Sequence, residues 1–225
     1  MPLSKKQQGE QTRAALLAAA EALFAEHGFE GARVDDIAER AGHNKALIFR
    51  YFGNKLGLYA AVLQRADVEF GALLKRLFVP LLADPALTTE AGRFRSFLEA
   101  TFGTIFDYMV AHPQFTRMIN WEQAAAWRTF AGLASQFEPA EFAQLSGLFR
   151  QAQAAGLLRP DLDAVQAVLL AQQLCWSAPN SLPLYQLFRA GRRVSKARAL
   201  AHLRAQVIAL SVNGMLLDPL RARKG

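Results

Sequence analysis

The segment Ala41–Lys55, AGHNKALIFRYFGNK, carries side chains suited to nucleic-acid binding where a buried helix would carry aliphatic ones. Arg50 can donate two hydrogen bonds to guanine, and Phe49 can contact thymine methyl groups. Tyr51 and Lys55 can reach phosphate, and such contacts fix the register of a protein on DNA without reading the base sequence. These residue types predict a DNA-reading surface, although a partly buried helix with ordinary surface cations would also explain them.

A short helix over residues 45–52 would position these side chains. Ile48 and Phe52 are four residues apart, so they share one face and are expected to anchor the helix to a core. The outward positions are then Lys45, Ala46, Phe49 and Arg50, with Leu47 and Tyr51 at the flanks.

Two further helices precede this one and supply its support. The first is expected from about 12 to 27, with Thr12 as its N-cap and Gly28 at its end. The second is expected from about 34 to 41, and Asn44 then caps the third. Two helices joined by a few residues that include a glycine are typical of a helix-turn-helix.

Helical periodicity continues along the chain, and no period-two stretch with strand flanks appears. The sequence therefore predicts an all-α fold of about nine helices, with residues 1–54 as the helix-turn-helix domain and 55–225 as a helical body. Asp161 is expected to cap the helix that follows it. The long helices are expected at about 55–78, 89–111, 114–136, 139–155, 161–177 and 195–214. Breaks are expected at Pro80 with Pro85, Pro113, Pro139, GLLRPD and SAPNSLPLYQLFRAGRR.

Composition narrows the class of protein. Basic residues number 26 and acidic residues 19, which favours a polyanionic partner without naming one. Residues 1–60 hold eight basic and seven acidic side chains, so most of the excess lies elsewhere, in part in 189–198 and at Arg221, Arg223 and Lys224. No apolar run suggests a membrane span, the N-terminus is polar, and the single Cys175 excludes an internal disulfide. A cytoplasmic protein without membrane contact is expected.

Residues 28–63, GFEGARVDDIAERAGHNKALIFRYFGNKLGLYAAVL, resemble the DNA-binding signature of TetR-family transcriptional regulators. The similarity extends over about residues 12–60, through the DIAERAG second helix and the YF.NK..L close. The segment HPQFTRMINWE (112–122) also resembles one found in many members.

The resemblance implies a homodimer that binds a near-palindromic double-stranded operator and is released by a small-molecule effector, most often as a repressor. Residue by residue, it places DNA contacts at Lys45, Ala46, Leu47, Phe49, Arg50 and Tyr51, and a phosphate contact at Lys55. Thr12 and Arg33, at the openings of the first two helices, are further candidates. Arg33 stands where the family often has a capping Ser or Thr.

The helical body offers candidates for an effector site. A stripe of large side chains at helical spacing is more often core than pocket, but a pocket would also use such residues. The candidates are Phe102, Phe106, Met118, Trp121, Trp127 and Gln173. Glu122 lies on an apolar stripe, and a buried carboxylate needs a partner. That partner is either an internal arginine, such as Arg95 or Arg117, or a group on the effector.

The helices at about 161–177 and 195–214 carry leucines and valines that either close the monomer core or pair across a two-fold axis, as the resemblance implies. An enzyme is the main competing class, since sites assemble from distant residues. The four histidines are far apart, however, and no metal-ligand spacing, phosphate loop or nucleophile elbow is present. We therefore expect no catalytic residue, no metal and no cofactor. A helical carrier of small molecules that does not bind DNA is the other alternative.

Overall fold

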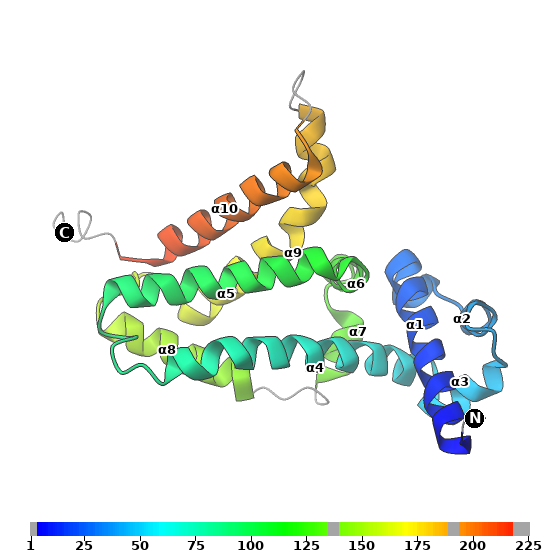
Figure 1. Ribbon diagram of the computed structural model, residues 1–225. Coiled ribbons are helices and arrows are strands. Elements are labelled where there is room, and N and C mark those ends of the chain that lie inside the picture. Colours follow the sequence, from blue (N-terminus) through cyan, green and yellow to red (C-terminus); the bar gives the residue numbers. More distant parts are fainter. Residues whose placement is uncertain (1–3, 135–139, 189–193, 218–225) are drawn as a thin grey trace. The chain divides into compact units, whose positions relative to one another are not determined.

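The computed structural model describes residues 4–134, 140–188 and 194–217, and these residues form ten helices and no strand (Figure 1). An isolated β-bridge joins Leu158 to Leu216. The expected all-α class is confirmed. The chain divides into two compact units, residues 1–70 with 112–137 and residues 71–111 with 138–225.

The first unit contains the helix-turn-helix. Its helices are α1 (Lys5–Gly31), α2 (Val34–Arg40), α3 (Lys45–Phe52), the start of α4 (Lys55–Leu82), α6 (Pro113–Ala124) and α7 (Arg128–Ala131). They share one apolar core, whose fully buried members include Leu16, Phe24, Ile37, Ile48 and Leu58. Helix α6 packs against α1 and contributes Met118 to that core.

Helix α1 begins earlier than predicted. Ser4, not Thr12, is the N-cap: its Oγ accepts from the Gln7 amide at 3.2 Å, and Gln7 Oε1 accepts from the Ser4 amide at 2.9 Å. This reciprocal pair is a capping box. Gly28 leaves the helical conformation at φ 69° as predicted, but one more turn follows it before the helix ends at Gly31.

Helix α3 has the predicted bounds. The Asn44 side chain accepts from the Ala46 amide at 2.8 Å, which confirms Asn44 as its cap. Helix α2 ends at Arg40, one residue short of the expected bound.

The single helix expected over 114–136 is wrong. Helix α6 ends at Ala124, and α7 starts at Arg128 after Ala126 and Trp127 adopt left-handed φ angles of 54° and 59°. No glycine or proline marks this break, so the local sequence does not predict it.

The second unit holds the rest of α4 with α5 (Ala91–Ala111), α8 (Ala140–Ala154), α9 (Ala164–Phe188) and α10 (Lys196–Met215). Helices α5, α9 and α10 pack on one another, and α8 packs on α9. Fully buried aromatic side chains of α5 form much of this core: Phe94, Phe97, Phe102 and Phe106. Asp107 on α5 and Arg204 on α10 form a two-bond ion pair at 2.7 and 2.9 Å.

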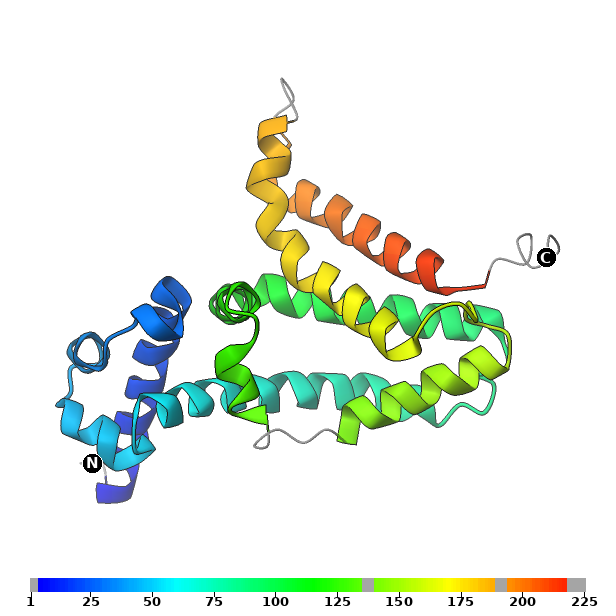
Figure 2. The ribbon, with the colours of Figure 1, turned by 180° about the vertical axis from the view of Figure 1, so that it is seen from behind.

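Helix α9 contradicts two expectations. It does not end near residue 177 but continues through Pro179 and Pro183 to Phe188, and Figure 2 shows it changing direction along its length. Proline in a helix removes a hydrogen bond and bends the axis rather than always ending it. Its first turn is capped by Asp163, which accepts from the Gln166 amide at 2.8 Å, whereas Asp161 pairs with Arg159 at 2.6 Å.

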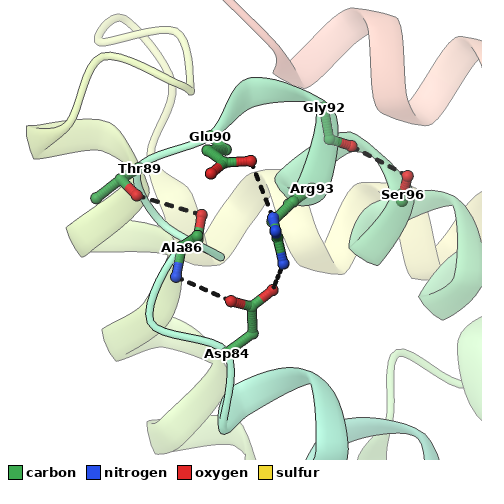
Figure 3. A network of polar contacts seen from close by, with 7 residues as sticks. All are labelled: Asp84, Ala86, Thr89, Glu90, Gly92, Arg93 and Ser96. Carbon is green, nitrogen blue, oxygen red and sulfur yellow. Dashed lines mark hydrogen bonds and ion pairs between the residues drawn. The ribbon is translucent and has the colours of Figure 1, made fainter.

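The connection from α4 to α5 is held by polar contacts (Figure 3). Arg93 bonds to Asp84 at 2.6 Å and to Glu90 at 2.9 Å, and Asp84 also accepts from the Ala86 amide at 3.0 Å. The hydrogen bond from Arg93, and after it the one from the Ala86 amide, lower the pKa of Asp84. Helix α4 includes Pro80 in its last turns, so the predicted break falls after Leu82 instead.

Some expectations fall outside the described residues: the break at Pro139, the basic residues of 189–193, and Arg221, Arg223 and Lys224. Within the described residues, no helix has the length and apolar character required to cross a membrane.

Candidate DNA-binding interface

Helix α3 presents the predicted outward face. Lys45, Ala46, Phe49 and Arg50 are exposed, Leu47 and Tyr51 are half-buried, and Ile48 is completely buried. Phe49 keeps 49% of its surface accessible, so an aromatic ring stands on the same face as the cationic side chains. The helix is therefore anchored through Ile48 and leaves a mixed cationic and apolar surface free for a partner.

Neighbouring groups engage three of the cationic side chains. Lys45 Nζ lies 2.8 Å from Asp35 of α2, and both groups are exposed. Arg50 lies over the Tyr51 ring with its Cζ 5.8 Å from the centroid. Lys55 Nζ donates to the Glu30 carbonyl at 3.2 Å and lies 4.6 Å from the Phe29 ring centroid, so it is occupied within the protein.

The two weaker candidates differ in position. Arg33 is the N-cap residue of α2, makes no side-chain cap bond, and is exposed. Thr12 is half-buried inside α1, so its predicted place at the start of a helix is wrong.

Glu122 is buried, as its position on the stripe predicts, but neither predicted arginine is its partner. Tyr59 Oη on α4 donates to Glu122 Oε1 at 2.7 Å, and the Phe130 amide in α7 donates to Glu122 Oε2 at 3.1 Å. Arg95 instead bonds to Asn213 at 2.9 Å, and Arg117 is exposed. Burial, and then the hydrogen bond to Glu122, raise the pKa of Tyr59 far above its ordinary value.

This carboxylate also explains the break before α7. A negative charge beside the first amides of a helix is stabilising because those amides have no intrahelical partner. Glu122 supplies it from the preceding helix, while its own carbonyl accepts from the Trp127 amide at 2.7 Å. The Tyr59 contact spans 63 residues, and sequence spacing gives no signal for it.

The structure does not gather the predicted effector residues in one unit. Met118, Trp121, Glu122 and Trp127 belong to the first unit, whereas Phe102, Phe106 and Gln173 belong to the second. Phe102, Phe106 and Met118 are buried in the two cores. Trp121 is 45% exposed and donates from Nε1 to the Ala25 carbonyl at 3.3 Å. It borders an open hollow of about 590 Å³ lined by Ala25, Glu26, His27, Arg117, Asn120 and Trp121.

Comparison with known proteins decides the family. Residues 16–62 match the model of bacterial regulatory proteins of the tetR family, and residues 95–210 match the tetracyclin repressor-like C-terminal domain. The chain belongs to the TetR family. It is a DNA-binding transcriptional regulator of this family.

Individual relatives agree with this assignment. The repressor NicS of Pseudomonas putida is 30% identical over 76% of this chain and 77% of its own length. The repressor SCO4008 of Streptomyces coelicolor is 36% identical over 50% of each chain, so this chain spans about half of that relative. The crystal structure of the regulator SCO4942 from Streptomyces coelicolor covers 91% of this chain and 98% of its own, with 29% identity and a TM-score of 0.60.

Proposed function

We propose that this TetR-family protein binds a near-palindromic operator as a homodimer, inserts one α3 per subunit into the major groove, and is released by a small-molecule effector. The observation that carries the proposal is the exposed face of α3, anchored by Ile48 and lying inside the segment that matches the family's DNA-binding model. A cytoplasmic location follows from a chromosomal target.

The side chains have separate roles on DNA. Arg50 donates to guanine, and Ala46, Leu47 and Phe49 contact thymine methyl groups. Tyr51 and Arg33 bind phosphate, as does Thr12 where its hydroxyl reaches the backbone. Lys45 and Lys55 join them by exchanging Asp35 and the Glu30 carbonyl for phosphate oxygens. For Lys55 this exchange replaces a neutral acceptor with a charged and therefore stronger one.

Helices α9 and α10 supply the proposed dimer interface. Leu169, Leu170 and Leu174 on α9 and Leu210 on α10 are 42 to 66% exposed. Val207 and Val212 face the core instead, so these two helices both close the subunit and leave an apolar surface uncovered. A two-fold pairing would hold two recognition helices on the order of 34–36 Å apart, one turn of DNA.

The effector is proposed to act by favouring a state whose recognition helices no longer fit successive grooves. Its effect cannot exceed the difference between its affinities for the two states. Phe102, Phe106 and Gln173 of the second unit are the proposed contacts, with Met118, Trp121 and Trp127 as candidates in the first. Glu122 has two internal donors, which favours a structural role for it over an effector contact.

A helical small-molecule binder or an enzyme without DNA binding is the competing proposal. The two classes differ in salt dependence. An operator-binding protein loses affinity steeply as salt rises, because each neutralised phosphate releases counterions.

The operator proposal is tested by selecting the fragments of genomic or random DNA that the wild-type protein binds and those that the Arg50→Ala variant binds. The wild type should recover a near-palindromic site. The variant should lose about 1–3 kcal/mol on that site and accept other bases where Arg50 reads guanine. Recovery of no palindrome would overturn the operator proposal, and unaltered base preference in the variant would remove Arg50 as a base reader.

A further inference from the structure

One face of α1 lies beside the recognition helix. A Cβ atom at Gly9 would lie 3.4 Å from Tyr51 Oη, and the Arg13 Cζ lies 5.4 Å from the Phe52 ring centroid. Gly9 and Arg13 are one turn apart, so together they fix which side of α1 faces α3. Figures 1 and 2 both show the first turns of α1 next to α3.

The same face carries a row of cations. Lys5 and Lys6 precede Gly9 by four and three residues and Arg13 follows it by four, so all three project on the side of α1 that Gly9 occupies. Glu10 follows Lys6 by four residues and precedes Arg13 by three, so this one carboxylate borders the same face. We call Lys5, Lys6 and Arg13 the α1 basic row.

The row has no acidic partner. All three side chains are exposed, and none forms an ion pair with any residue that the structure describes. Other cations of the same unit are engaged: Arg40 lies 3.0 Å from Glu26, and Lys45 pairs with Asp35. The face therefore carries three cations and one carboxylate, and this net positive charge beside α3 favours a polyanion as its partner.

The row is held by folded structure. The capping box of Ser4 and Gln7 satisfies the first amides of α1, so Lys5 and Lys6 stand on formed helix. Their place relative to α3 is thus set before DNA arrives, which lowers the entropic cost of binding.

We propose that Lys5, Lys6 and Arg13 bind phosphates of the DNA backbone flanking the bases that α3 reads, so that α1 provides a second grip on each half-site. This inference rests on the proposed binding of α3 to an operator. Phosphate contacts carry no base information. The row therefore raises affinity for operator and non-operator duplexes alike and lengthens the footprint without changing the sequence preferred.

The test compares Lys5→Ala/Lys6→Ala with the wild type by fluorescence anisotropy on the selected operator duplex and on a scrambled duplex, across a salt series. Alanine preserves the helix. The slope of log affinity against log salt should become shallower by about 0.9 for each lost phosphate contact, and both duplexes should weaken by similar factors. Lys5→Arg/Lys6→Arg should restore the wild-type slope, because it keeps the charges.

Lys196→Ala/Arg198→Ala is the matched control. These are exposed cations in the first turn of α10, behind the Ser195 cap, and their loss should leave the slope unchanged. An unchanged slope in the Lys5/Lys6 alanine variant overturns the proposal, as does weakening confined to the operator duplex. Failure of the operator proposal itself is distinguishable, since the wild type would then prefer no duplex over the scrambled one.

Discussion

At the residue scale, the buried pair of Tyr59 and Glu122 shows how a group suspected of ligand binding can be structural. The carboxylate accepts two hydrogen bonds, from a phenol and from a backbone amide, and is 2% exposed. Such a carboxylate is satisfied without a ligand. The Tyr59 ring also packs edge-on against Phe24, with centroids 4.9 Å apart, so the pair ties α6 and α7 to the core beneath the helix-turn-helix.

Tyr59→Phe should destabilise the fold by about 1–3 kcal/mol, because the Glu122 oxygen it leaves is buried and loses a donor. Glu122→Gln should cost a similar amount, because one amide oxygen cannot accept from both donors as strongly. The two losses should be less than additive in the double variant. Urea unfolding of the four proteins measures this. Full additivity would mean that the two side chains do not interact.

The same tyrosine gives a pH dependence. Its folded pKa is raised above the ordinary 10.0, so its contribution to stability is complete below pH 10 and falls as pH rises beyond that, by up to about 1.4 kcal/mol per pH unit. The stability gap between the wild type and Tyr59→Phe should narrow between pH 9 and 11. All other ionisable groups are common to the two proteins, so their contributions cancel in this gap. A gap that stays constant would contradict the raised pKa.

At the element scale, the local sequence predicts features that depend on neighbouring residues, and it fails for features that depend on long-range contacts. The bounds of α3, its Asn44 cap and its Ile48 anchor were predictable, because capping and helical spacing are local. The break between α6 and α7 was not, since it depends on Glu122 and two left-handed residues that are neither glycine nor proline. The continuation of α9 through Pro179 and Pro183 was not predictable either, because the surrounding fold overrides the local tendency of proline to end a helix.

The end of α1 provides an element-scale prediction. Gly28 has φ 69°, and an added Cβ would lie 3.0 Å from Trp121 Cδ2. Gly28 combines this φ with a ψ of 179°, a region that essentially only glycine adopts. Gly28→Ala should therefore cost about 1–3 kcal/mol of backbone strain, and more for displacing the indole, which also bonds to Ala25. Gly42 also has a positive φ, 68°, and no atom lies within 4 Å of an added Cβ. Gly42→Ala should therefore show backbone strain without displacing a neighbour. Unfolding free energies and tryptophan emission separate the two effects. Tryptophan emission that Gly28→Ala leaves unchanged would show that the added Cβ does not displace Trp121.

At the scale of the whole molecule, α9 and α10 carry large apolar side chains that no described part of the chain covers. They are Leu169, Leu170 and Leu174 on α9, Leu210 on α10, and Leu184, Leu187 and Phe188 further along α9, the last two 79 and 82% exposed. A soluble monomer rarely exposes so many large apolar side chains on neighbouring helices. Whether these helices close the core or pair two subunits was open in the sequence. Their buried valines and exposed leucines fit both roles at once.

Leu170→Asp places a charge on this surface and tests the dimer directly. If the surface is the interface, the variant should sediment as a monomer at concentrations where the wild type is a dimer, because a buried unpaired carboxylate opposes association. Operator binding should then weaken and become steeper in protein concentration, since two monomers must meet on the DNA. Val79→Asp is the control: its 67% exposure matches the 63% of Leu170, and it lies on α4. A dimer that survives Leu170→Asp, or dissociates equally with Val79→Asp, would place the two-fold axis elsewhere.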